Sequence, residues 1–263
     1  YGKGTPDELF GKVSADGFAA VQLAYKKCVP SVKSYADVTD ALVAETVAAE
    51  KAHRIQVAVL GTYVELAIND ESRLCNVADF KSQLAVCKAL GAGCIGTETT
   101  AMSKQPAGTT RAQAQELLCR SLADILPAAE ALGVTVAVEP VTYHSMNSAA
   151  ATRHILDTMR SPNLKVIFDM SNLVDAGNVG AQDRIWNDVG ELLGDQIVAV
   201  HFKGQAFAPD GGLLHTSLED SLTDYAGAFA MLRQLPQKTL PVLREEAVPA
   251  KAASDIAYMR SFF

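Results

Sequence analysis

Residues 134–169 read VTVAVEPVTYHSMNSAAATRHILDTMRSPNLKVIFD. The apolar, β-branched runs at the two ends, residues 134–139 and 164–169, have the length and composition of buried strands. Between them, residues 148–159 show the apolar spacing of a helix. A strand, a helix and a second strand in this order form the unit that joins neighbouring parallel strands by a right-handed crossover. The segment therefore predicts an α/β fold built on a parallel sheet.

The same alternation continues in both directions along the chain. The first helix has a clear start signal, because Thr5 is followed by Pro6 and two acidic residues. Further helices are expected at residues 5–15, 39–52, 77–90, 111–132, 182–193, 224–235 and from about 252, and further strands at 18–24, 55–60, 94–97, 197–202 and 240–245. The pattern gives eight helices but seven strands, and the unmatched helix is the first.

So regular an alternation predicts a single domain, residues 1–263, that closes into a (β/α)8 TIM barrel. The first strand of that barrel is then expected upstream of Tyr1, and an open doubly wound sheet is the alternative fold. The irregular stretches 61–76, 99–110 and 204–221 all follow strands. In a barrel they lie on the C-terminal rim, where the active sites of this fold are built.

The amino-acid composition indicates which kinds of binding partner and which cellular location to expect. The formal net charge of −7 argues against broad nucleic-acid binding, and no apolar run is long enough for a membrane span. The five cysteines include no C-x-x-C pair. Free thiols, buried for Cys87, Cys94 and Cys119, and a reducing cytoplasmic location are therefore expected.

One nucleotide-binding pattern is present but stands in the wrong context. Residues 91–96, GAGCIG, match G-x-G-x-x-G. A dinucleotide site needs a strand before these glycines and a helix after them, whereas here a helix precedes and a strand follows. The glycines are interpreted as a helix stop and a tight turn. The chain also has no P-loop, H-E-x-x-H or G-x-S-x-G sequence.

Ionisable residues end four successive predicted strands. Glu139 and Asp169 end two of them, His201 lies near the end of the third, and the fourth ends in Glu245 and Glu246. Parallel strands bring these ends to one face of a barrel, where several carboxylates would repel one another unless a cation neutralised them. Carboxylate oxygens with one imidazole nitrogen suit Mn²⁺, Mg²⁺, Co²⁺ or Zn²⁺. The sequence therefore predicts a divalent-metal site.

Taken together, these pieces resemble the xylose isomerase-like TIM-barrel superfamily. Within it, the chain looks like the sugar phosphate isomerase/epimerase branch, which includes ketose 3-epimerases and, more distantly, endonuclease IV. The matching pieces run in family order over nearly the whole chain: residues 17–23 (GFAAVQL), 96–99 (GTET), 138–140 (VEP), 168–173 (FDMSNL), 201–203 (HFK) and 243–246 (LREE).

The resemblance implies that Glu139, Asp169, His201 and Glu245 are the metal ligands, with Mn²⁺ expected first and Mg²⁺, Co²⁺ or Zn²⁺ as alternatives. Glu246 remains the alternative to Glu245, because a slip of one residue exchanges which side chain faces the barrel axis. Two departures leave the substrate open. Asn172 stands where ketose 3-epimerases carry a histidine, and residues 204–207 supply no arginine after the histidine strand.

Other polar residues are placed by their distance from strand ends. Lys203, His144, Glu98 and Asn172 are expected to contact the substrate, and Gln22 and Glu65 are weaker candidates for the pocket. The remaining residues are expected elsewhere: His53 and His154 on helices, His215 in a loop without an assigned partner, and Trp186 in packing between helices.

The resemblance also implies a reaction. Glu139 and Glu245 would remove and return a proton beside the carbonyl of a small sugar or sugar phosphate, through an ene-diolate stabilised by the metal. This predicts a metal-dependent isomerase or epimerase. The alternatives are a lyase, dehydratase or non-catalytic member that keeps the metal, and an endonuclease IV-like phosphodiesterase. The oligomeric state stays open, with a homo-oligomer among the alternatives.

Overall fold

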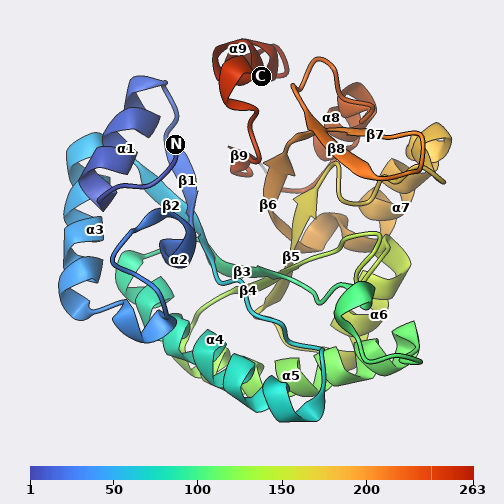
Figure 1. Cartoon of the computed structure of the whole chain (residues 1–263), viewed down its shortest axis with the longest axis horizontal. Helices are drawn as coiled ribbons and strands as arrows, with labels where there is room; N and C mark the ends of the chain where they lie inside the picture. Colours follow the sequence, from blue (N-terminus) through green and yellow to red (C-terminus); the bar gives the residue numbers. More distant parts are fainter. Residues whose placement is uncertain (238) are drawn as a thin grey trace.

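The computed structural model describes residues 1–237 and 239–263 and contains one main parallel sheet (Figure 1). Along the sheet, the order of the strands follows their order in the sequence, and every hydrogen-bonded pair is parallel. The strands described are β1 (Ala20–Leu23), β2 (Gln56–Gly61), β3 (Cys94–Glu98), β4 (Val136–Glu139), β5 (Leu164–Asp169), β6 (Ile197–Phe202) and β9 (Val242–Arg244).

The two edge strands of this sheet, β1 and β9, curl toward each other and leave an opening between them (Figure 1). Their Cα atoms approach within 8 Å, although the two strands are not hydrogen-bonded neighbours in the described part of the chain. The sheet is thus a nearly closed parallel barrel. The predicted α/β TIM-barrel class is confirmed, and the open doubly wound alternative is wrong.

Helices surround the barrel on its outside (Figure 1). Their ends follow the expected chemistry: Thr5 and Glu8 form a capping box at the first helix, and Gly91 and Gly133 end two helices in the left-handed conformation. The α-helices are α1 (Pro6–Ala15), α2 (Tyr25–Cys28), α3 (Asp40–His53), α4 (Asp70–Leu90), α5 (Arg111–Leu132), α6 (Ala149–Met159), α7 (Gln182–Leu193), α8 (Tyr225–Leu232) and α9 (Ala252–Arg260).

A small apolar layer fills the inside of the barrel and forms the floor of the site. It is separate from the large core between strands and helices. Gly96 makes room for this layer, because a Cβ there would lie 2.5 Å from Ile167 Cδ1. The layer contains Ala58, Val59, Cys94, Ala137, Ile167, Ala199 and Leu243.

Some predicted boundaries are wrong. Helix α4 begins at Asp70, not at residue 77, because its first turns are polar and exposed and so lack the apolar spacing that marks the rest. The short helix α2 was not predicted. The stretch 204–221, expected to be irregular, contains an antiparallel hairpin of β7 (Gly204–Phe207) and β8 (Leu213–Thr216).

Two expectations from composition can be compared with the structure. The five cysteines are free, with Cys87 and Cys94 buried and Cys119 half-buried, where burial had been expected. Among the residues that the structure describes, none of the helices has the length and apolar character needed to cross a bilayer.

Candidate metal centre

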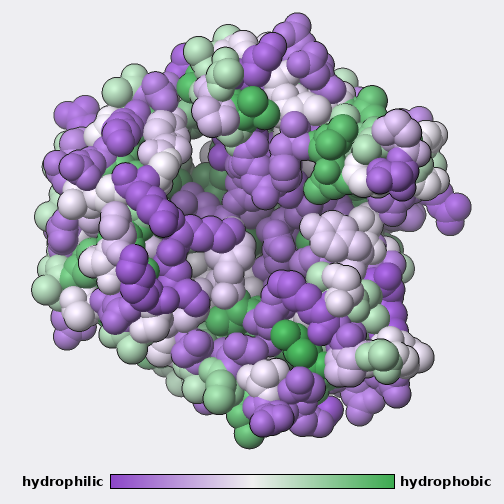
Figure 2. Space-filling model, in the orientation of Figure 1, coloured by the Kyte–Doolittle hydropathy of each residue, from purple (hydrophilic) through white to green (hydrophobic). Residues whose placement is uncertain are grey.

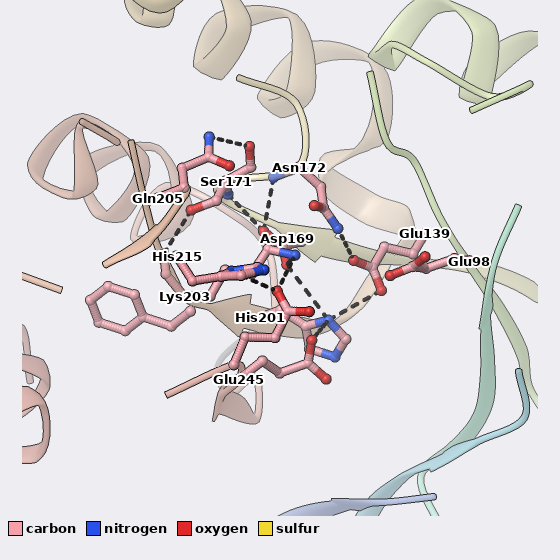
Figure 3. Close-up of polar contacts among 12 residues, drawn as sticks. Glu98, Glu139, Asp169, Ser171, Asn172, His201, Lys203, Gln205, His215 and Glu245 are labelled. Atoms are coloured by element: carbon pink, nitrogen blue, oxygen red, sulfur yellow. Dashed lines mark hydrogen bonds and ion pairs between the residues drawn. The ribbon is translucent and has the colours of Figure 1, made fainter. Parts of the chain in front are cut away.

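The polar strand ends converge at the C-terminal mouth of the barrel (Figure 3). Glu139, Asp169 and His201, from β4, β5 and β6, are each at most 4% exposed, and one potential ligand atom from each lies within 4.8 Å of the others. Glu245 follows β9, with its Oε2 3.2 Å from His201 Nδ1. Each of the four stands two positions after a residue of the apolar floor, which alternation along a strand places on the same face.

Two buried polar atoms at this point lie beside charged groups. Asp169 accepts at Oδ1 from the backbone N–H groups of Ser171 (2.7 Å) and Asn172 (2.9 Å), but its Oδ2 has no hydrogen bond. His201 Nδ1 lies 3.1 Å from Glu139 Oε2 and 3.2 Å from Glu245 Oε2, within ion-pair distance of both carboxylates. Both atoms face charged groups, because Lys203 Nζ lies 3.3 Å from Asp169 Oδ2 and two carboxylates flank His201 Nδ1; a cation between them would coordinate both.

The charges also fit a cation. Burial raises the pKa of Asp169, and burial together with the Glu139 charge raises the pKa of Glu245 to about 7. Burial would lower the pKa of His201, but Glu139 and Glu245 outweigh it and raise that pKa to about 9. The site therefore favours positive charge at its centre. Carboxylate oxygens with one imidazole nitrogen suit a divalent ion such as Mn²⁺, Mg²⁺, Co²⁺ or Zn²⁺.

A cavity of about 750 Å³ lies between β1 and β9, where one further strand is expected from the sequence, and it borders the site at Gln22, Glu98 and Glu245. Figure 2, which has the orientation of Figure 1, shows a hollow surrounded by hydrophilic residues on the face toward the reader. Gln22, Tyr63, Glu98, Glu245 and Glu246 line its polar part. A volume of this order is typical of small-molecule sites.

Comparison with known proteins decides the family. The family model of the xylose isomerase-like TIM barrel matches residues 10–262. This chain belongs to that family. No curated protein matches the chain in sequence.

Solved structures of similar shape include proteins that carry metals or act on sugars. The 3-keto-D-glucoside 4-epimerase of E. coli is 16% identical with a TM-score of 0.73, over 99% of this chain and 96% of that one. A xylose isomerase-like TIM barrel protein of Mycobacterium smegmatis in complex with magnesium is 14% identical (TM-score 0.73; 97% and 87% covered). The IOLI protein with a bound zinc atom is 16% identical (TM-score 0.74; 97% and 90% covered). At these identities the likeness shows the fold.

In this xylose isomerase-like barrel, Asn172 lies behind the predicted ligands. It is 4% exposed and donates from Nδ2 to Glu139 Oε1 at 2.5 Å. Asn172 was predicted to contact the substrate; in the structure its amide contacts a predicted metal ligand, and the substrate role stays a prediction. Burial alone would raise the pKa of Glu139, but the charges of His201 and Lys203 lower it.

Lys203 is buried beside the centre. Its Nζ lies 3.3 Å from Asp169 Oδ2 and 3.1 Å from Glu246 Oε2. Burial would lower the pKa of Lys203, but these two carboxylates raise it, so the ammonium stays charged. Glu245, and not Glu246, thus faces His201, while Glu246 pairs with Lys203 and has a left-handed backbone (φ 47°).

Glu98 and His144 form the rim next to Glu139. Glu98 ends β3 directly opposite Glu139 in the strand register, and its Oε2 is 3.9 Å from His144 Nε2. Burial and the Glu139 charge raise the pKa of Glu98 to about 7, whereas burial lowers the pKa of His144 to about 4. Both side chains are placed to meet a substrate, and this role stays a prediction.

The weaker candidates divide into two groups. Gln22 reaches the centre and contacts both His201 and Glu245, whereas Glu65 pairs with Lys104. Sequence reasoning missed Tyr63, whose hydroxyl accepts a hydrogen bond from Gln22 (2.8 Å). No local pattern marks Tyr63, because it follows β2 in an irregular segment.

The remaining expectations concern residues thought to lie outside the pocket. The placement of His215 in a loop is wrong: it lies in β8, and the hairpin brings its Nδ1 to 3.4 Å from Glu246 Oε2. The Asp210-Gly211 pair in the hairpin turn was the available signal. Trp186 is buried and packs edge-on against Phe168. His53 pairs with Asp7 on the outside, and His154 lies on α6.

Proposed function

We propose that this protein is a divalent-metal-dependent isomerase or epimerase of a small sugar or sugar phosphate. The proposal depends on one observation: three carboxylates, of Glu139, Asp169 and Glu245, meet the His201 imidazole at one buried point. Mn²⁺ is the first ion to test, followed by Mg²⁺, Co²⁺ and Zn²⁺.

A divalent ion held by these four residues would polarise a substrate carbonyl and lower the cost of negative charge on its oxygen. Glu139 and Glu245 belong to strands separated by β5 and β6, and each points its Oε2 toward His201 Nδ1, from 3.1 and 3.2 Å. In the proposal, one of these carboxylates removes a proton from the carbon beside the carbonyl and the other returns it. General base catalysis of this kind contributes roughly 10²- to 10⁴-fold.

In the proposal, the substrate lies at the C-terminal mouth of the barrel, against Glu98, His144 and Lys203. Lys203 already has two carboxylate partners, so the proposal gives it a substrate oxygen as a third contact. A phosphate group on the substrate would have to compete with Asp169 and Glu246 for the ammonium.

The test is solvent-deuterium exchange into a panel of ketoses and their phosphates, with Mn²⁺ present. The wild-type protein should incorporate deuterium beside the carbonyl, and Glu139→Gln should lose at least 10²-fold in rate. Glu45→Gln, an exposed glutamate on α3, is the matched control and should exchange at the wild-type rate. Unchanged exchange in Glu139→Gln would refute the base assignment, and release of water from the substrate would show a dehydratase instead.

A further inference from the structure

Gln22 connects two of the predicted metal ligands from the far side of the barrel opening. It lies in β1, whereas Glu245 follows β9 and His201 lies in β6. Its Nε2 donates to Glu245 Oε1 at 2.5 Å and to the Tyr63 hydroxyl at 2.8 Å. Its Oε1 lies 3.0 Å from His201 Nε2. All hydrogen-bonding atoms of this one amide are therefore engaged.

The backbone explains how Gln22 reaches this position. The pairing of β1 with β2 shifts register between Val21 and Gln22, because Ala58 is skipped in the ladder. The extra residue is Ala58 of β2, so β1 keeps the regular alternation of its side chains. Ala20 packs against the apolar floor inside the barrel, so Gln22, two positions later, faces the same interior nearer the mouth.

The chemistry of the contacts fixes which way the amide points. An ionised Glu245 can only accept hydrogen bonds, so the Gln22 atom facing it must be the NH₂ group. Gln22 Oε1 consequently faces His201, and because a carbonyl oxygen only accepts, His201 Nε2 must carry a hydrogen. His201 Nδ1, on the carboxylate side, is then the nitrogen whose lone pair is available to a cation.

We propose that Gln22 is a positioning residue of the metal centre. It keeps the His201 hydrogen on Nε2 so that Nδ1 meets the ion, and it holds Glu245 by Oε1 so that Oε2 stays directed inward. This inference rests on the proposed function, because it assigns a partner to ligands that function requires. Groups that orient metal ligands in this way typically change metal affinity 10- to 100-fold when removed.

The first experiment measures metal affinity by calorimetry with Mn²⁺ and with Zn²⁺. Gln22→Met keeps the length of the side chain but removes its donor and acceptor, and its dissociation constants should rise about 10- to 100-fold. The matched control is Gln83→Met, which alters a buried glutamine of α4 that bonds to Tyr35 and Ser82. It should bind both ions as the wild type does.

The second experiment identifies the nitrogen that binds the ion. In the ¹⁵N-labelled wild type loaded with Zn²⁺, NMR should show the ion on His201 Nδ1 and a slowly exchanging proton on Nε2. That proton should exchange faster in Gln22→Met. Zinc on Nε2, or wild-type affinity in Gln22→Met, would overturn the role of Gln22 while leaving the metal site standing. A wild type that binds none of the ions would instead overturn the proposed function, and this inference with it.

Discussion

Glu139 and Glu245 approach the same imidazole nitrogen from different strands, their Oε2 atoms lying 3.1 and 3.2 Å from His201 Nδ1. Each gives its other oxygen, Oε1, to a side-chain amide at 2.5 Å, which comes from Asn172 for Glu139 and from Gln22 for Glu245. The two carboxylates are thus held alike, with one oxygen anchored and one directed inward. The proposed reaction would use this pair, one carboxylate to remove the proton and the other to return it.

Removing the anchor of Glu139 should disturb that pairing. In Asn172→Ala, Glu139 Oε1 loses its donor and the carboxylate is free to rotate, so deuterium exchange should slow by about tenfold or more. The exposed Asn187 of α7 offers the matched control Asn187→Ala, which should leave exchange unchanged. Equal rates in the two variants would show that the amide does not position Glu139.

A substitution of Asp169 can test metal binding directly while keeping the hydrogen bonds that its side chain accepts from the backbone. In Asp169→Asn, the carbonyl oxygen can still accept from the N–H groups of Ser171 and Asn172, but the charge at Oδ2 is lost. The variant should fold and bind Mn²⁺ far more weakly. Wild type should gain about 2.7 kcal/mol in unfolding free energy at 100 times its dissociation constant, and the variant should gain almost nothing at that concentration. An equal gain would mean that the ion binds elsewhere.

Lys203 should have opposite effects on folding and on metal binding. In the metal-free protein, Lys203→Met leaves Asp169 and Glu246 without their cation, and loss of a buried partner typically costs about 3 kcal/mol. The same change removes a positive charge beside a metal ligand, so Mn²⁺ affinity should rise while the KM for substrate increases. Urea unfolding with EDTA, calorimetry and steady-state kinetics measure the three effects. Weaker Mn²⁺ binding would contradict the argument.

The fold could largely be predicted from the sequence because most strands are short, mainly apolar and β-branched runs that alternate with helical stretches. Residues 164–169 and 197–202 were predicted with the bounds that β5 and β6 have. Local sequence patterns do not predict elements whose formation depends on tertiary contacts. Helix α4 was predicted to start late because its first turns are exposed, and the hairpin was missed because residues 213–215 are exposed and lack an apolar–polar alternation.

The candidate ligands could be predicted because they occupy equivalent positions at strand ends, whereas the residues that hold them could not. Gln22 meets Glu245 across 223 positions of sequence, so the contact depends on how the barrel brings β1 close to β9. Asn172 was noticed as a departure from a family pattern, but its bond to Glu139 depends on the turn that Asp169 Oδ1 stabilises. Such contacts follow from three-dimensional packing.

The raised pKa of Glu98 predicts how stability depends on pH in the metal-free protein. Burial and Glu139 raise this pKa from 4.5 to about 7, so the unfolded chain releases the proton first and stability falls as the pH rises through this window. Glu98→Gln removes the ionisable group and, with it, this loss of stability at high pH. It should match wild type near pH 4 and be more stable at pH 8, by about 1 kcal/mol because the side chain is 35% exposed and partly screened. Denaturant unfolding at both pH values, with Glu45→Gln as control, checks the sign.

The β7–β8 hairpin needs a glycine at position 204, and this requirement can be tested separately from metal binding. Gly204 pairs with Thr216 at the base of the hairpin, and a Cβ there would lie 2.4 Å from Ser217 O and 2.5 Å from Thr216 O. Neither backbone oxygen can yield cheaply, so Gly204→Ala should displace β8 and cost about 1–3 kcal/mol.

His215 belongs to β8, so displacing β8 in Gly204→Ala should break the contact of His215 with Glu246. Backbone hydrogen exchange should then speed up across residues 213–216. The four predicted ligands lie outside the hairpin, so Mn²⁺ affinity should change little while KM rises. Gly180→Ala, where a Cβ meets nothing within 4 Å, is the control and should behave as wild type. Unchanged exchange at residues 213–216 would show that the close approach at Gly204 does not hold the hairpin in place.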